Sequence, residues 1–419
     1  IRMSENKVLS FFKEILCIPR ESGHEEHIVE YLLEFARQRN LEAKRDVTGN
    51  VLIVKEAAPG KENVPTVVLQ SHSDMVCEKK AGVEHDFSKD PIQYVERDGW
   101  WIAEDTTLGA DCGIGIAATL ALFDSDIPTG RLEALFTISE ETGMDGAFAL
   151  SGDFITGKIL INLDSEDEGQ LFIGCAGGID TTAVFRYNEG KLAPGMCASR
   201  FTIKGCIGGH SGDDINKERA NAVQCLARFL YETMGYDMEL CSIDGGNKRN
   251  AIAREASAVI AFPEQYEDEI LAIWNEFCRN LSAEYAATDP GISFEAEPVT
   301  WTEGTVETEV AYRLIAALVY APHGVLAMST ELKGIVETSS NLASVKMKEG
   351  GVFRVGTSQR SSIDSARRFA ATRVEAAFAI AGAEVTHESE YPGWKPRLNS
   401  PILNTTVESY RKLFNQEPI

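Results

Sequence analysis

The sequence predicts an α/β fold, in which a mostly parallel mixed sheet covered by helices carries an inserted α+β domain. Apolar runs at 50–55, 66–72, 131–138 and 158–163 alternate with helical patterns, as in a parallel sheet with helices on its faces. After about residue 180 the strand patterns become longer and alternate with polar residues, which is typical of antiparallel pairing. The strands expected there are TTAVFRY at 181–187, SRFTIKG at 199–205, ASAVIAF at 256–262 and GGVFRVGTS at 350–358. The length of 419 residues also exceeds what one hydrophobic core usually organises.

The first elements are two amphipathic helices, at 5–16 and 25–40, which Pro19 and Gly23 separate. The glycine-spaced segment that begins at Gly113 predicts a helix of small residues packed tightly on the sheet. A short helix is expected near 144–150, between the last two strands of this region.

The domain boundaries follow the change of pattern. We expect the first part of one domain at 1–180, an inserted domain at 181–388, and a return to the first domain at 389–419. Because the chain ends one helix into this return, we expect that last part to be incomplete. We find no internal repeat. In the inserted domain, helices are expected at 220–234, 265–282, 306–320 and 363–380.

Composition excludes several classes of partner. A net charge of −24, from 64 acidic and 40 basic residues, would repel nucleic acid and anionic membranes. No apolar stretch reaches the roughly 18 residues that a membrane span needs, and the start lacks a signal-peptide pattern. The nine cysteines occur singly, which favours reduced thiols. The sequence therefore predicts a soluble, cytoplasmic protein.

Metal-binding side chains follow four successive runs in the first 165 residues. Because the carboxyl ends of parallel strands meet at one edge of a sheet, we expect these side chains to converge there. Imidazole together with carboxylates is typical of zinc with an open position for water. Taken singly, each residue is a weak signal, because it is also explained as a surface group at the end of a strand. The residues are His72, Asp74, Asp111, Glu140, Glu141 and Asp164.

The spacing within this set predicts different roles. His72 and Asp74 are two apart on a strand, so they share a face, and the carboxylate can accept the second N–H of the imidazole. Of Glu140 and Glu141, one can bind metal while the other acts as a general base. The glycines around Asp111 also fit a phosphate-binding loop, but the spacing matches neither common nucleotide motif.

Several motifs together resemble the zinc metallopeptidases of the aminoacylase and carboxypeptidase type and, within that family, the aminoacyl-histidine (Xaa-His) dipeptidases. The resemblance covers nearly the whole chain. The motifs are SHSDMVCEK at 71–79, HDFSKDPI at 85–92, TTLGADCGIG at 106–115, SEETG at 139–143, LDSE at 163–166, GGHSG at 208–212, the Asn250-Ala-Ile turn and QRSS at 359–362.

The resemblance implies two zinc ions in one active site. Asp111 would bridge them, with His72 and Asp164 on one ion and Glu141 on the other, and the peptide bond after Asp111 would be cis. Relatives supply a last histidine ligand from the C-terminal part of the catalytic domain, and this chain ends before any such segment. Either the chain belongs to a longer protein, or solvent fills that position of the second site.

The resemblance also assigns the catalytic and substrate-binding residues. Glu140 would be the general base and Asp74 would orient the metal-binding histidine. In the inserted domain, His210 would stabilise the tetrahedral oxyanion, and Asn250 and Arg360 would hold the backbone and C-terminal carboxylate of a substrate. An arginine fork suits a carboxylate, although His210 and Arg360 are also explained as a turn residue and a solvated surface residue.

We therefore expect a zinc-dependent dipeptidase that hydrolyses small unblocked peptides, of the Xaa-His type, by a metal-bound hydroxide with a glutamate base. One alternative is an N-acyl amino acid deacylase with the same machinery, and another is a catalytically silent metal-binding relative. The resemblance implies that 1–180 and 389–419 form the catalytic domain, that 181–388 is a lid or dimerisation domain, and that the protein is a homodimer. The preferred dipeptide, the native metal and the oligomeric state stay open at this stage.

Overall fold

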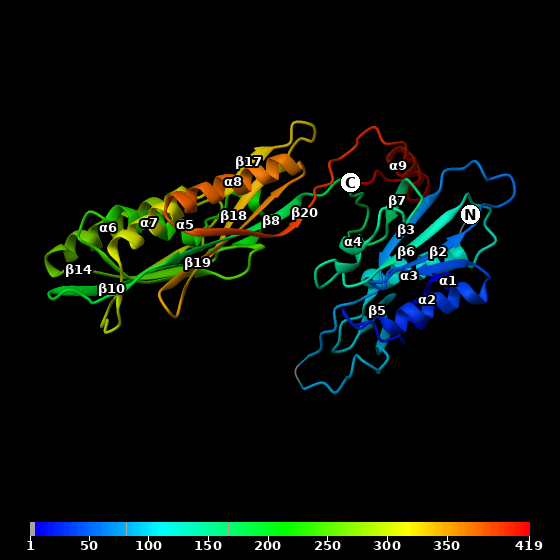
Figure 1. The fold of residues 1–419 in the computed structure, drawn as a ribbon, viewed down its shortest axis with the longest axis horizontal. Coiled ribbons are helices and arrows are strands. Elements are labelled where there is room, and N and C mark those ends of the chain that lie inside the picture. Colours follow the sequence, from blue (N-terminus) through cyan, green and yellow to red (C-terminus); the bar gives the residue numbers. More distant parts are fainter. Residues whose placement is uncertain (1–4, 81, 166) are drawn as a thin grey trace. The chain divides into compact units, whose positions relative to one another are not determined.

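The computed structural model describes residues 5–80, 82–165 and 167–419, which form two compact units (Figure 1). The first unit contains the chain up to Leu171 and again Pro401–Ile419, and the second contains Phe172–Ser400. Strands β8 (Gly177–Arg186) and β20 (Glu384–Tyr391) each span a position where the sequence analysis places a boundary. Both strands lie in the second unit, where they pair with each other.

The first unit is built on a five-stranded sheet of order β1-β2-β6-β3-β7. Strand β3 pairs in parallel with β6 and β7, whereas β2 runs antiparallel to both of its neighbours. The sheet is mixed, because β2 alone runs opposite to the other four strands, and it confirms the predicted α/β class. It brings the carboxyl ends of β3, β6 and β7 to one edge. The strands are β1 Glu42–Arg45, β2 Val51–Lys55, β3 Val67–His72, β6 Leu132–Thr137 and β7 Ile159–Asn162.

Helices cover one face of this sheet. Helices α1 (Glu5–Ile15), α2 (Glu26–Gln38) and α3 (Ala110–Phe123) share a hydrophobic core with Ile53 and Phe136 of the sheet. The helices form where apolar residues recur at helical spacing, as at positions 28, 32 and 35 of α2, all of which are buried. On the opposite face, the segment around Phe154 packs against a smaller core.

The remaining elements of the first unit are short or peripheral. Helix α4 (Asp145–Ala149) follows the turn after β6, and β4 (Tyr94–Arg97) and β5 (Trp100–Ala103) form an antiparallel hairpin. Helix α9 (Pro401–Phe414) has no buried residue, and the chain beyond it bonds back through Ile419 to the segment before the second unit.

The second unit contains a nine-stranded antiparallel sheet, whose main path is β15-β10-β14-β12-β18-β19-β8-β20, with β17 paired to β18. The strands not yet defined are β10 Met196–Lys204, β12 Glu239–Gly246, β14 Ala256–Pro263, β15 Ser293–Val299, β17 Gly324–Met328, β18 Val336–Lys348 and β19 Val352–Ser361. Two-residue strands form two small ribbons, β11 Gly209–His210 with β13 Ala251–Ile252, and β9 Glu189–Gly190 with β16 Thr305–Val306.

This sheet consists of two halves with the same topology. In the first half the order along the chain is β10, α5, β12, β14, α6, β15, and in the second it is β8, α7, β18, β19, α8, β20. Both are βαββαβ units with the spatial strand order 4-1-3-2, and they join through the equivalent strands β12 and β18. The first half is inserted in the second between β8 and α7. Although the sequence shows no repeat, the architecture therefore has one.

Four helices lie on one face of this sheet (Figure 1). Large apolar side chains such as Phe229, Trp274, Leu314 and Phe378, one from each helix, share a single core with the strands. The helices match those expected from the sequence in number and position, whereas β12, β15, β17, β18 and β20 were not anticipated. The helices are α5 Ala222–Thr233, α6 Glu267–Glu284, α7 Thr308–Tyr320 and α8 Asp364–Ile380.

All nine cysteines are free thiols. Among the described residues, no helix combines the length and the apolar character that crossing a membrane requires.

Candidate metal centre

His72 is the last residue of β3, and its side chain is only 1% exposed. Its Nδ1 lies 3.2 Å from Oδ1 of Asp74, as the i, i+2 spacing predicts. Its Nε2 faces two other carboxylates, with Oδ1 of Asp111 at 3.0 Å and Oδ1 of Asp164 at 3.3 Å. One ring nitrogen is thus held by Asp74 while the other points to the place where the predicted ligands meet.

Asp111 and Asp164 reach this place from different elements. Asp111 lies near the start of α3, where the backbone leaves helical geometry at 111 and 112, and the peptide bond to Cys112 is cis, as the resemblance implies. Asp164 follows β7, and Glu166, the last residue of its motif, lies outside the described residues. The side chain of Asp111 is 41% exposed, so the centre is open to solvent on this side.

Glu140 and Glu141 follow β6, on the turn that begins at Ser139. Ser139 has a φ of 52°, so the strand ends here and the chain turns. The backbone N–H groups of Glu140 and Glu141 then donate to the two oxygens of Asp74, at 3.0 and 3.2 Å. One carboxylate oxygen of each glutamate lies within 4.8 Å of a ring nitrogen of His72. The six residues of the predicted set therefore converge.

Crowded carboxylates shift the titration of this cluster. Burial disfavours the charged imidazole, but contacts with Asp164, Asp74 and Asp111 outweigh it and raise the pKa of His72 to about 11. Burial and the adjacent Asp164 raise the pKa of Asp111 to about 6, and burial likewise raises the pKa of Glu140. Several carboxylates around one imidazole form a charge arrangement that a divalent cation satisfies.

One orphaned atom supports the same conclusion. Oδ1 of Asp164 is buried and has no hydrogen bond within the described part of the chain. Nε2 of His72 lies 3.3 Å from this atom but is closer, at 3.0 Å, to Oδ1 of Asp111. Buried polar atoms are almost always paired, so an unpaired carboxylate oxygen in a nest of ligands fits a metal ion.

Cys112 belongs to the same group of potential ligand atoms, and the sequence analysis did not propose it. Its sulfur lies 3.4 Å from the carbonyl oxygen of Leu163, and burial raises the pKa of its thiol to about 12. Its position directly after Asp111 was the one available signal. Within the described residues, both groups with metal-binding spacing lie in the first unit, around His72.

The three residues predicted from the inserted domain gather in the second unit. His210 lies on β11 and pairs with Ala251, directly after Asn250, whose carbonyl accepts from the N–H of Ser211 at 2.8 Å. Arg360, on β19, reaches the same place: a Cβ at position 212 would lie 3.2 Å from the His210 ring and 3.7 Å from Nη1 of Arg360.

Unsatisfied donors mark this second cluster. Nη1 of Arg360 donates to the hydroxyl of Tyr391 at 3.2 Å, whereas its Nε is buried without a partner in the described chain. The hydroxyl of Ser211 is buried and equally unpaired. Donors left open beside an arginine fork fit an anionic ligand such as a carboxylate.

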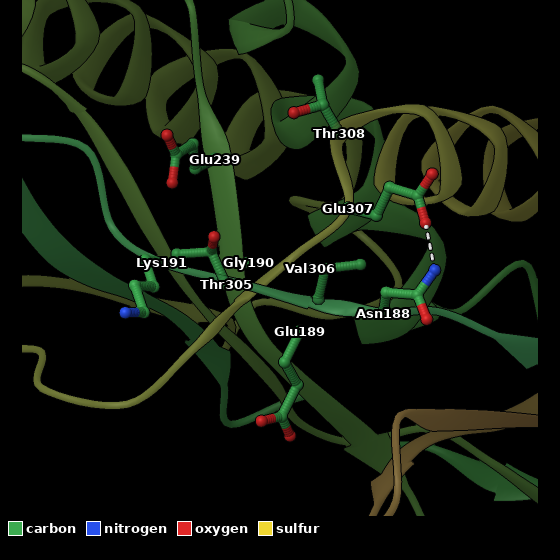
Figure 2. Close-up of a pocket in the computed structure, with 9 residues that line it drawn as sticks. All are labelled: Asn188, Glu189, Gly190, Lys191, Glu239, Thr305, Val306, Glu307 and Thr308. Atoms are coloured by element: carbon green, nitrogen blue, oxygen red, sulfur yellow. Dashed lines mark hydrogen bonds between the residues drawn. The ribbon is translucent and has the colours of Figure 1, made fainter.

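A separate cavity of about 340 Å³ in the second unit lies around the β9–β16 ribbon (Figure 2). The predicted site residues do not line it. Its lining carries three glutamates and one lysine, and Glu307 accepts from the side chain of Asn188 at 3.4 Å. The lining residues are 188–191, Glu239 and 305–308.

Comparison with known proteins gives matches that cover different parts of the chain. Residues 195–289 match the peptidase dimerisation domain of the M20 type, which is nearly the whole first half of the repeated topology. The cytosol non-specific dipeptidase of Escherichia coli (strain K12) is 39% identical over 421 residues, which cover 100% of this chain and 86% of the relative.

Solved structures agree with these matches. The crystal structure of aminoacylhistidine dipeptidase from Vibrio alginolyticus has a TM-score of 0.94 and 38% identity, covering 100% of this chain and 86% of that one. Aminopeptidase PepT from Bacillus cereus has a TM-score of 0.61 at 17% identity, with 100% and 84% of the two chains covered, and supports the fold alone.

Proposed function

The chain belongs to the M20 family of peptidases, and from this premise we propose that it is a zinc-dependent dipeptidase acting on small unblocked peptides, among them Xaa-His dipeptides. The convergence of His72, Asp111 and Asp164, with the imidazole Nε2 3.0 and 3.3 Å from the two carboxylates, is the observation that carries the proposal. A dipeptidase is the activity for which the E. coli and Vibrio relatives are named.

The ligand set fits two divalent ions. Asp111 would bridge them, His72 and Asp164 would complete one site and Glu141 would contribute to the other. The orphaned Oδ1 of Asp164 and the mixture of imidazole and carboxylate support zinc. Bound there, the ions would polarise the scissile carbonyl and lower the pKa of water.

Glu140 is the residue that moves the proton. It lies one position before the proposed ligand Glu141, and its backbone is fixed by the bond to Asp74. Burial raises the pKa of its carboxyl, which brings the group closer to the range where it can both accept and return a proton. In this scheme Glu140 takes a proton from the attacking water and delivers it to the leaving amine. Asp74 keeps His72 in the tautomer whose Nε2 is free for metal.

The cluster in the second unit binds the substrate. The guanidinium of Arg360, with its free Nε, would hold the C-terminal carboxylate, and Asn250 would hold the peptide backbone. His210 would donate to the oxyanion. A free carboxylate is therefore part of what the enzyme recognises, which favours peptides with a free C-terminus over C-terminally blocked ones.

We also propose that the protein forms a homodimer and works in the cytoplasm. The match of residues 195–289 to a domain named for dimerisation supports the first point, and the cytosolic name of the E. coli relative supports the second.

A substrate panel tests the proposal. Glycyl-histidine, beta-alanyl-histidine, other unblocked dipeptides and N-acetyl amino acids are assayed with zinc, manganese or cobalt, alongside metal analysis. We expect turnover of the dipeptides and little of the N-acetyl compounds. Preference for the N-acetyl compounds would indicate the deacylase, and bound metal without any hydrolysis would indicate a silent relative.

A further inference from the structure

Residues 20–25, which lie between α1 and α2, contact the turns that carry the residues of the proposed metal centre. Segments that join helices are usually exposed, yet Arg20 is 1% and Glu25 is 5% exposed. Long charged side chains are rarely buried to this extent without a task for their polar atoms. Both side chains form hydrogen bonds with turns that carry the predicted site residues, and Glu25 also accepts one from the N–H of Gly23.

Arg20 ties two of these turns together. Its Nη1 donates to the carbonyl oxygens of Asp74 and Ser73, at 2.6 and 3.3 Å, and its Nη2 donates to the carbonyl of Gly109. One guanidinium therefore joins the turn after His72 to the turn before Asp111. The planar fork of arginine spans several acceptors at once, which the single ammonium of lysine does not.

The glycines of the Asp111 motif make room for this guanidinium. A Cβ at position 109 would lie 2.6 Å from Nη2 of Arg20, and one at position 113 would lie 2.8 Å from the same atom. Gly109 also has a φ of 72°, a conformation that favours glycine. These glycines thus serve the buried arginine as well as the geometry of the metal-facing turn.

Glu25 holds the third turn. It occupies the N-cap position of α2 but makes no side-chain bond to its own helix. Its Oε1 instead accepts from the N–H and the hydroxyl of Ser139, at 2.9 and 3.0 Å. Ser139 has the left-handed backbone that starts the turn to Glu140, so this carboxylate fixes the residue on which the direction of Glu140 depends.

Ser22 completes the contacts, because its hydroxyl donates to Oδ2 of Asp74 at 2.7 Å. Each of the turns after β3, before Asp111 and after β6 is thereby bonded to the same six-residue segment. We propose that residues 20–25 are a positioning element of the metal centre: Arg20 and Ser22 set the affinity for metal, and Glu25 sets the orientation of Glu140. This inference rests on the proposed function for the role of Glu140, but not for the metal affinity.

The test compares Arg20→Lys, Ser22→Ala and Glu25→Gln with the parent chain, using zinc alone in competition with a chromophoric chelator. Loss of a residue that orients metal ligands typically weakens metal binding about 10–100-fold, and we expect this for Arg20→Lys, with a smaller loss for Ser22→Ala. Glu25→Gln should leave zinc affinity unchanged, lower kcat without changing KM, and speed hydrogen exchange at the amides of 139–141.

Arg39→Lys is the matched control. Arg39 is another arginine of the first unit, only partly buried, and it pairs with Asp124 and stacks on Phe35, away from the three turns. We expect it to lower the Tm without changing zinc affinity. If Arg20→Lys and Ser22→Ala only lower the Tm in the same way, the inference is wrong.

The measurements without substrate distinguish a failure of this inference from a failure of the proposed function. Zinc titration and hydrogen exchange need no substrate, so weakened binding in the Arg20 and Ser22 variants of a chain that hydrolyses no dipeptide would support the inference and contradict the proposed function. Should Arg20→Lys fail to fold, Ser22→Ala, which removes a single hydroxyl, still decides the point: an unchanged zinc affinity would overturn the role of the segment.

Discussion

The carboxylate of Asp74 lies 3.2 Å from Nδ1 of His72 and leaves Nε2 as the ring atom that faces Asp111 and Asp164. Asp74 also accepts from Ser22 and from the amides of Glu140 and Glu141. Burial alone would raise its pKa, but the bonds from His72, Ser22 and Glu140 lower it to about 2. Asp74 therefore stays ionised and acts purely as an acceptor at neutral pH.

Replacement of Asp74 by asparagine should weaken metal binding, because an amide holds the imidazole less firmly and lacks the charge. We expect a loss of about 10–100-fold in zinc affinity, measured by chelator competition. Asp153→Asn, the same change at an exposed position of the first unit, should leave the affinity unchanged. Equal affinities for both variants would contradict the role given to Asp74.

Glu140→Gln should lower kcat by about 10²–10⁴-fold, the usual contribution of a positioned general base. The amount of bound metal should not change, because Glu140 is not a proposed ligand. Glu141→Gln is the companion variant, and it should instead reduce the number of ions bound per chain. Metal analysis and steady-state kinetics on both proteins check the assignment, which fails if the two phenotypes are reversed.

Arg360→Lys should raise KM for unblocked dipeptides about 10–100-fold, because a charge-assisted bond contributes about 1.5–3 kcal/mol. C-terminally amidated dipeptides should be nearly indifferent to the change, since they carry no carboxylate. Arg354→Lys on the same strand, where the side chain is exposed, serves as the control and should leave KM unchanged. An equal effect on amidated and free dipeptides would contradict carboxylate binding by Arg360.

Glu133 lies away from the metal centre, and its buried carboxylate should make the stability of the fold depend on pH. Its buried side chain accepts from Thr156 and from the amide of Gly157. Burial opposes ionisation, but these bonds outweigh it and lower the pKa from 4.5 to about 2. Since the folded pKa lies below the unfolded one, the carboxylate adds stability above pH 4.5 that is lost as the pH falls toward 2.

Glu133→Gln should therefore lower the free energy of unfolding at pH 7 by about 1–3 kcal/mol. The difference from the parent chain should shrink between pH 4.5 and about 2. Urea denaturation at pH 7, 5, 4 and 3 measures it. A difference that stays constant over this range would show that the ionised form of Glu133 is not what stabilises the fold.

The convergence of the six side chains could be predicted because most of them follow strands that the sequence pattern identifies, whereas Asp111 lies at the start of α3. His72 ends an apolar run, Asp164 follows another, and parallel strands bring such ends together. Arg20 and Glu25 could not be found in this way. Their partners are backbone carbonyls and amides of distant turns, which leave no side-chain pattern, and Pro19 and Gly23 indicate only a break between helices.

The second unit was predictable in its helices and only partly in its sheet. The helices carry a full apolar face, whereas edge strands such as β15 and β20 are largely exposed and lack a clear alternation. The repeated topology could not be predicted either. Two halves need only the same order of elements and apolar positions to pack alike, so their sequences share no visible period.

The two βαββαβ halves of the second unit lie in one polypeptide, so their sequences can differ. His210 and Asn250 come from the copy built around β10, and Arg360 comes from the copy built around β8. Two identical subunits joined at equivalent strands would each have to carry every one of these groups. A single continuous chain divides them between its copies, so a substitution in one is not mirrored in the other, and selection can act on each copy separately.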